Sequence, residues 1–232
     1  MGQINLSPSV CTFLVAGESV CWLPKVASRY AKPRMTTTPA LVYLCDLTYS
    51  QQTISSDVIP AAVGCIAAYA ERELQGRAIF EIFKFPETLI EALETGPIPR
   101  AIGFSNYCWN EDLSTEFARV IKLKYPEMII IFGGPNYPTV EKEQERFLRA
   151  YPQVDFYISK EGEIGFTTLI NSLLAVDFDA KRVPNNLPSV RRSKFQGRQR
   201  LREQIFRAPK WCPAITEVAY FLYARTDCIF AN

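Results

Sequence analysis

Apolar and polar positions follow a repeated pattern between residues 40 and 174. Short, continuous apolar runs alternate with longer segments in which apolar residues recur at helical spacing. A continuous apolar run is typical of a strand buried on both faces of a parallel sheet, and its alternation with helices indicates βα units. The pattern predicts strands over 40–45, 78–84, 101–105, 128–132 and 156–159, and helices over 58–74, 86–96, 112–124, 140–150 and 164–174.

Helix-boundary signals support this reading. Ser56 and Asp57 offer an N-cap for the first helix, Pro60 falls in its first turn, and Gly76 follows its end. Right-handed crossovers between parallel strands then restrict the topology. We expect an α/β fold with a doubly wound, five-stranded parallel sheet in the flavodoxin-like (Rossmann-like) order 2-1-3-4-5.

Charge divides the chain into three regions. Residues 41–179 contain 11 Lys/Arg against 20 Asp/Glu, whereas residues 181–210 contain 10 Lys/Arg against one acid. We therefore predict a loosely ordered leader or extension over 1–39, an α/β domain over 40–176, and a basic, divergent tail without a domain over 177–232. The tail's composition permits a single helix, over 197–207. Basic charge also permits contact with nucleic acid, but without interleaved aromatic residues it favours a disordered or displaced segment.

Composition also bears on compartment and chemistry. The seven cysteines are scattered without a CxxC pair, which indicates reduced thiols and a cytoplasmic location. No apolar stretch has the length of a membrane span, so no membrane is expected as a partner. The chain has no histidine, which excludes Ser-His-Asp and Cys-His catalysis and any imidazole ligand to a metal.

Polar residues and glycines follow four of the predicted strands. Parallel strands end at one edge of the sheet, where ligands of doubly wound folds bind. The segments are Asp46, Thr48 and Tyr49 after the first strand, Ser105, Asn106 and Tyr107 after the third, Gly133, Gly134 and Pro135 after the fourth, and Glu161 and Gly162 after the fifth.

Each segment also has a purely structural interpretation. The glycines at 133–134 allow close approach of a ligand or make a tight turn, and they match neither GxGxxG nor a P-loop. Ser105 bonds a ligand or caps a turn, and Asp46 lines the crevice or begins a solvated loop. Glu161 and Glu163 form a carboxylate pair or, as we favour, are acids at a helix start.

Taken together, these segments resemble the cobalamin-binding domain at the N-terminus of cobalamin-binding radical SAM proteins. The resemblance rests on residues 44–49, 101–110, 131–136 and 154–163, in that order, and covers 135 of the 232 residues, 40–174. It implies a corrin ring over the carboxyl edge of the sheet. The implied cofactor-binding residues are Asp46, Thr48, Tyr49, Ser105, Asn106, Tyr107, Gly133, Gly134, Pro135, Glu161 and Gly162.

The sequence departs from that family in three places. The DxHxxG motif reads Asp46-Leu-Thr-Tyr-Ser-Gln51, with Thr48 at the histidine position, so cobalamin would bind without an axial histidine. The CxxxCxxC motif is absent, so neither an iron–sulfur cluster nor S-adenosylmethionine is expected on this chain, and no catalytic or metal-ligating residue is assigned. Beyond about residue 190 the resemblance ends, which fits a truncated or frame-shifted end.

We therefore interpret the chain as a cobalamin-binding domain from a truncated or partial radical SAM protein. Whether it is an enzyme stays open, because methyltransferase-type chemistry needs the absent motif and a separate radical SAM core protein as partner. The alternative is a flavodoxin-like interaction or regulatory domain that has lost cofactor binding, with Tyr49 and Gln51 filling the cleft. A nucleotide- or flavin-binding enzyme is disfavoured, because the sequence has no phosphate-binding loop.

Overall fold

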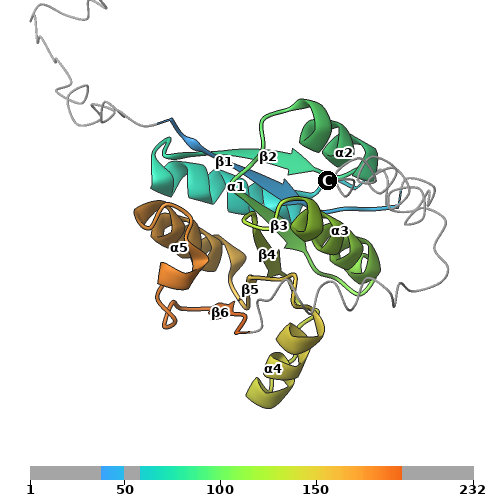
Figure 1. The fold of residues 1–232 in the computed structure, drawn as a ribbon, viewed down its shortest axis with the longest axis vertical. Helices are drawn as coiled ribbons and strands as arrows, with labels where there is room; N and C mark the ends of the chain where they lie inside the picture. Colours follow the sequence, from blue (N-terminus) through green and yellow to red (C-terminus); the bar gives the residue numbers. More distant parts are fainter. Residues whose placement is uncertain (1–37, 50–57, 195–232) are drawn as a thin grey trace, which may run out of the picture. The chain divides into compact units, whose positions relative to one another are not determined.

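Six strands form one sheet in the part of the chain that the structure, a computed structural model, describes: residues 38–49 and 58–194. The strands are β1 (Ala40–Cys45), β2 (Ala78–Phe83), β3 (Ala101–Ser105), β4 (Ile129–Gly133), β5 (Phe156–Ile158) and β6 (Val190–Arg192). The helices are α1 (Ala61–Leu74), α2 (Pro86–Thr95), α3 (Glu111–Lys124), α4 (Glu141–Ala150), α5 (Gly162–Ala175) and the short 3-10 turn η1 (Ala180–Arg182). The strand order is β2-β1-β3-β4-β5-β6, parallel except for β6 (Figure 1).

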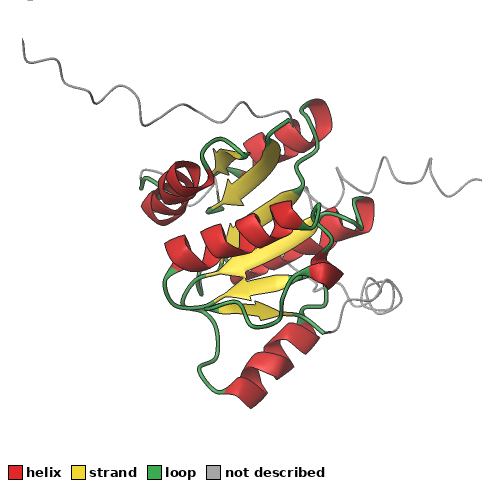
Figure 2. Cartoon of the chain, turned by 90° about the vertical axis from the view of Figure 1, so that its left-hand side faces the viewer, coloured by secondary structure: helices red, strands yellow, loops and turns green. Residues whose placement is uncertain are grey.

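Helices cover both faces of the sheet, as Figure 2 shows. Because successive side chains of a strand point to opposite faces, β1 divides its apolar residues between two cores. Val42 and Leu44 pack in the core beneath α1 and α5. Tyr43 and Cys45 pack in the core beneath α2, α3 and α4. The resulting burial of both faces explains why the sequence of β1 is continuously apolar.

The predicted α/β architecture is confirmed, with the first five strands in the order 2-1-3-4-5. The ends of some helices differ from the predicted ends by a few residues. Helix α1 begins at Ala61, three residues later than predicted, because Pro60 is its N-cap rather than part of its first turn. Helix α5 begins at Gly162, two residues earlier than predicted. Ser56 and Asp57 lie outside the described residues.

The sheet has one strand that was not predicted: β6 pairs antiparallel with β5 and forms the edge beside the five parallel strands. Its sequence, Val-Arg-Arg, has no apolar run that would indicate a strand. Hydrogen bonds hold it instead: the Arg192 guanidinium donates to the carbonyl oxygens of Ala180, Lys181 and Val183 at 3.1–3.2 Å. The predicted helix over 197–207 lies outside the described residues, as does nearly all of the predicted leader.

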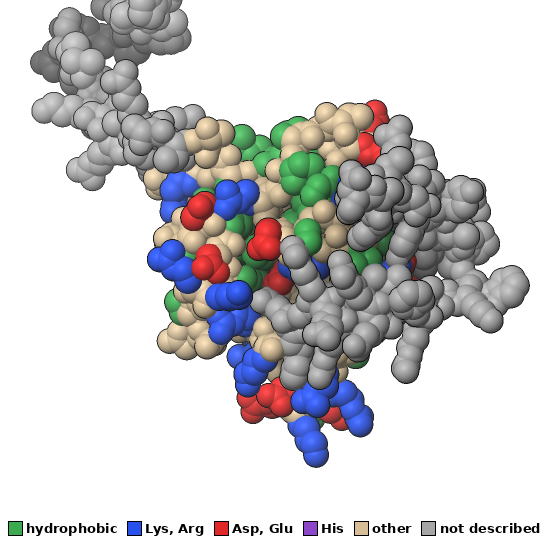
Figure 3. Space-filling view, viewed as in Figure 1, with side chains coloured by type: hydrophobic (Ala, Val, Ile, Leu, Met, Phe, Trp, Pro, Cys, Tyr) green, Lys and Arg blue, Asp and Glu red, His purple; other side chains and the backbone are tan. Residues whose placement is uncertain are grey.

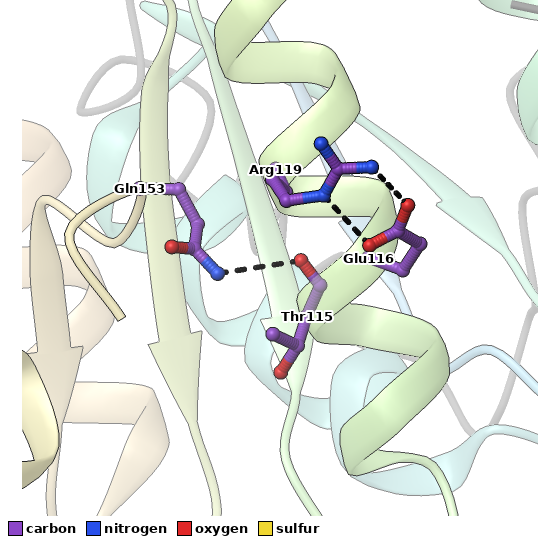
Figure 4. A network of polar contacts seen from close by, with 4 residues as sticks. All are labelled: Thr115, Glu116, Arg119 and Gln153. Atoms are coloured by element: carbon purple, nitrogen blue, oxygen red, sulfur yellow. Dashed lines mark hydrogen bonds and ion pairs between the residues drawn. The ribbon is translucent and has the colours of Figure 1, made fainter. Parts of the chain in front are cut away.

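Polar contacts join α3 to the segment that leads into β5 (Figure 4). Gln153, which is buried, donates from Nε2 to the Thr115 carbonyl oxygen at 3.4 Å. On the same helix Arg119 Nε donates to Glu116 Oε2 at 2.8 Å. By contrast, α4 has Leu148 as its one buried residue, and charged side chains of both signs gather over it (Figure 3).

The longest helices within 38–49 and 58–194 have 14 residues. A span of the hydrocarbon core needs about 20 apolar residues. None of the described helices is long and apolar enough to cross a membrane.

A buried ion pair lies near the amino end of β5. Asp155 Oδ2 accepts hydrogen bonds from Lys122 Nζ at 2.6 Å and from the Ile130 N–H at 2.7 Å. Burial raises the pKa of Asp155 above its ordinary 3.8, although Lys122 acts to lower it. Lys122 therefore favours the ionised form of Asp155, which burial disfavours.

We expect Lys122→Met to destabilise the fold by about 3–5 kcal/mol at pH 7, because it leaves a buried carboxylate without its partner. An acid whose folded-state pKa is raised stabilises the fold at low pH, and this contribution is lost as pH rises through the folded pKa. Removing Lys122 raises that pKa further, so the difference from the wild type should shrink at pH 4. Urea unfolding at pH 7 and pH 4 measures this difference in the free energy of unfolding.

Lys124→Met on the exposed side of α3 is the matched control and should change stability by about 0.5 kcal/mol or less. Equal losses in the two variants would contradict the assignment of Asp155 as a carboxylate that depends on Lys122. A loss for Lys122→Met that is unchanged between pH 7 and pH 4 would contradict it as well.

Candidate functional site

A cavity of about 370 Å³ opens at the carboxyl edge of the sheet, between the strands and the first turns of α1 and α5. This size lies in the range of roughly 300–1,000 Å³ common for small-molecule sites. Its wall is mainly apolar, with Leu44, Ile66, Phe104, Ile131, Ile158 and Phe166 among the lining residues. The cavity therefore suits a ligand with an apolar, compact part.

The structure divides the eleven predicted site residues into two groups. Those that line the cavity are Ser105, Tyr107, Gly133, Gly134, Pro135 and Gly162. Those that do not line it are Asp46, Thr48, Tyr49, Asn106 and Glu161. Lining shows position only, and cofactor binding by these residues stays a prediction.

Asp46 is engaged within the protein. Its Oδ1 accepts a hydrogen bond from Ser105 Oγ at 2.5 Å. Asn110 Nδ2 donates to Ser105 Oγ at 3.0 Å and to the Leu47 carbonyl oxygen at 3.3 Å. These contacts join the loop after β1 to the loop after β3. Asp46 therefore does not begin a solvated loop, and the neighbouring Leu47 and Thr48 are buried.

Backbone contacts extend the β1–β2 pairing past the end of β1. The Asp46 N–H donates to the Phe83 carbonyl oxygen at 2.9 Å, and the Thr48 N–H to that of Lys84 at 3.0 Å. Thr48, which stands where the DxHxxG motif has histidine, is 8% exposed. This position is thus held near the sheet rather than in the wall of the cavity.

Asn106, Gly134 and Tyr157, which we call the junction residues, join the loops after β3 and β4. Asn106 is fully buried and its Nδ2 donates to Tyr157 Oη at 3.2 Å. Tyr157 Oη donates in turn to the Gly134 carbonyl oxygen at 3.1 Å. Burial raises the pKa of Tyr157 well above its ordinary 10.0, so the hydroxyl stays protonated and can donate.

The two glycines at the end of β4 have different roles. Gly134 has φ +130°, and a Cβ there would lie 2.6 Å from the Asn106 carbonyl oxygen. The turn therefore requires a glycine at position 134. A Cβ at Gly133 would meet nothing nearer than 3.7 Å, and the residue lines the cavity. The tight-turn interpretation therefore holds for Gly134, whereas Gly133 leaves room on the cavity side.

An aromatic pair stands at the loop after β3. The rings of Tyr107 and Trp109 stack with centroids 4.4 Å apart and planes 8° apart. Trp109 is 62% exposed, whereas Tyr107 lines the cavity. The Tyr107 N–H donates to Asn110 Oδ1 at 2.9 Å, which fixes the start of this loop.

Sequence reasoning missed part of the wall. Ala62, Val63 and Ile66 of α1 line the cavity, as does Lys160. Glu163, which we considered as an acid at a helix start, lines it as well. The α1 residues carried a usable signal, since the helix after the first strand begins at the ligand-binding edge. Lys160 carried none, because its place in the wall depends on a left-handed backbone conformation, φ +66°.

Glu161 is the N-cap residue of α5, and its carbonyl oxygen accepts from the Gly165 N–H at 3.3 Å. Glu163 lies in the first turn of that helix. Acids at this position interact favourably with the helix dipole. The helix-start interpretation of the two glutamates agrees with this geometry.

No protein-family model matches the chain. Over 130 residues, 54% of its length, the chain is 30% identical to a 2-(S-pantetheinyl)-carbapenam-3-carboxylate methyltransferase of Streptantibioticus cattleyicolor, and the match covers 18% of that protein. Over 138 residues, 58% of its length, it is 29% identical to the cobalamin-dependent radical SAM methyltransferase TokK of Streptomyces tokunonensis, covering 19% of it. The similar region thus spans less than a fifth of the length of these relatives.

We expect Gly134→Ala to destabilise the fold by about 2–3 kcal/mol, because alanine meets a strained φ and the Asn106 carbonyl oxygen. Gly64→Ala in α1 is the matched control. A Cβ at Gly64 meets nothing within 4 Å, and alanine favours a helix by about 1 kcal/mol over glycine. Urea unfolding should therefore show a lower free energy of unfolding for Gly134→Ala and a higher one for Gly64→Ala. A Gly134→Ala protein as stable as the wild type would contradict the role of Gly134 in the junction.

Proposed function

We propose that this domain binds cobalamin at the carboxyl edge of its sheet, with the cavity receiving the nucleotide arm of the cofactor. The observation that carries the proposal is the cavity itself, which opens at the edge where the strands end and has an apolar wall. The similarity to a protein named as a cobalamin-dependent radical SAM methyltransferase supports the choice of ligand.

The residues present fit this group. The base of the nucleotide arm is a flat, apolar ring system, and the wall offers aliphatic and aromatic side chains of all four parallel strands that surround the opening. Gly133 supplies open space where a side chain would otherwise project. Tyr107 adds a hydroxyl-bearing side chain to the same wall, and a hydroxyl can bond the polar edge of a ligand.

Cobalt would bind without an imidazole from this chain, because its 232 residues include no histidine. The residue at the corresponding motif position, Thr48, does not line the cavity. The Asp46–Ser105 pair is satisfied within the protein. We therefore propose that Asp46 and Ser105 hold the loops after β1 and β3 together and do not bind the metal.

When bound, cobalamin supplies methyl-transfer or radical chemistry. The part proposed for this chain is to hold the cofactor and to exclude water from its nucleotide arm. A CxxxCxxC motif does not occur in these 232 residues. A radical SAM core would have to come from residues outside this sequence, and a separate protein is the partner that we propose.

A second candidate is an interaction or regulatory domain that has lost cofactor binding. The observation that favours it is the internal engagement of Asp46 and Asn106, whose side chains contact other protein groups instead of the cavity. If this second candidate is correct, the purified protein is folded but has no affinity for corrinoids.

Gel filtration of the purified chain with hydroxocobalamin tests the proposal. We expect the corrin absorbance to elute with the protein. A folded protein peak without corrin absorbance would overturn cobalamin binding and favour the second candidate.

A pair of variants in α1 tests the place of binding. Ala62 and Ala68 are both exposed alanines, but only Ala62 belongs to the wall of this cavity. We expect Ala62→Trp to weaken cobalamin binding at least about tenfold, because the indole fills the opening, a loss of about 1.4 kcal/mol. Ala68→Trp should bind as the wild type does.

Equilibrium dialysis with detection of corrin absorbance measures both variants. Equal affinity of Ala62→Trp and the wild type would place the ligand elsewhere. A loss of affinity that is the same in the two variants would also refute this site.

A further inference from the structure

Among the described residues, Lys160 is the one positively charged residue in the wall of the mainly apolar cavity. Lys160 lies in the loop after β5 and belongs to the wall, where Glu163 is the other charged residue. Among the ion pairs of residues 38–49 and 58–194, none involves Lys160. Its ammonium group is therefore available to a ligand that enters from the edge of the sheet.

The backbone at this lysine has an unusual conformation. Lys160 has φ +66°, a left-handed conformation that costs a side-chain-bearing residue roughly 1–2 kcal/mol and that glycine adopts freely. The residue before it is anchored: the Ser159 N–H and Oγ both donate to the Ser189 carbonyl oxygen, at 2.8 and 3.3 Å. The loop keeps this conformation at Lys160 in spite of its cost, and the residue belongs to the wall of the cavity.

An apolar cavity with one available ammonium at its wall suits a ligand that joins an apolar ring to an anionic group. Ammonium–phosphate contacts are charge-assisted and stronger than neutral hydrogen bonds. The nucleotide arm of cobalamin has this construction, because a phosphodiester joins the corrin side chain to the ribose and its base. A ligand that carried only hydroxyl or amide groups would not need a positively charged residue in the wall.

We propose that Lys160 binds the phosphate of the nucleotide arm and so gives this cavity a preference for phosphate-bearing corrinoids. This assignment rests on the cobalamin binding proposed above. Asp46 and Asn106 do not line the cavity, whereas Lys160 belongs to its wall. Glu163 also belongs to this wall; its negative charge repels the negative phosphate and lowers the affinity that Lys160 provides.

Two corrinoids isolate the phosphate: cobinamide, which lacks the nucleotide arm, and cobinamide phosphate, which adds only the phosphate. With the full chain at low ionic strength, equilibrium dialysis should show that the wild type binds cobinamide phosphate about tenfold more tightly than cobinamide. The preference should fall as salt is added. Lys160→Met should abolish it, Lys160→Arg should retain it, and Glu163→Gln should increase it.

Two controls separate recognition from folding. Lys142→Met removes an exposed lysine of α4 and should keep the wild-type preference. Lys160→Gly should lose the preference while its melting temperature is not below that of the wild type, because glycine removes the strain at φ +66°. Loss of binding in that variant then reflects the lost charge.

The outcomes distinguish the two proposals. A wild-type preference that Lys160→Met retains would overturn the role of Lys160 and leave cobalamin binding standing. Equal binding of the two corrinoids by the wild type would do the same. Failure of the wild type to bind cobalamin and both probes would overturn both proposals.

Discussion

The loops after β3 and β4 have to meet at the edge of the sheet, and the hydrogen bonds of Asn106 make that contact possible. Parallel strands end with backbone groups that have no ladder partner, and buried polar groups without partners are costly. The Asn106 N–H donates to the Gly133 carbonyl oxygen at 2.6 Å, and its side chain reaches Asn136 and Tyr157. These bonds satisfy the N–H and Nδ2 of Asn106, whereas its buried Oδ1 has no hydrogen-bond partner among the described residues. Asn106 does not line the cavity, whose wall is mainly apolar.

The cavity also depends on how closely α5 approaches the sheet. Gly103 in β3 has no side chain, and a Cβ there would lie 2.9 Å from Leu44 Cδ2 and 3.5 Å from Phe166 Cε2. Phe166 of α5 therefore packs directly over the strand. Gly162 has the same effect toward α1, since a Cβ there would lie 2.8 Å from Ile66 Cδ1. Glycines thus bring the two helices and the sheet together around an opening of ligand size.

The architecture could be predicted from the sequence because burial on both faces leaves an unambiguous pattern. β1, β3 and β4 are continuous apolar runs, and each helix shows a period of its own. The edge strand β6 could not be predicted, because its stability comes from pairing with β5 and from the side chain of Arg192, not from apolar residues. Composition near residue 190 shows basic charge alone, which describes a strand edge and a tail equally well.

The sequence predicts that the site lies at the carboxyl edge of the sheet, but it does not predict which side chains line it. Strand ends identify which loops meet, whereas turn geometry decides which side chains enter the cavity and which contact neighbouring loops. Asp46 and Ser105 illustrate the difference: both lie at strand ends, they bond each other, and only Ser105 reaches the wall. Lys160 enters because of a single left-handed residue that no apolar pattern signals. Since the residues that hold the loops together are largely distinct from those that face the cavity, substitutions in the wall can change binding without changing the junction that supports it.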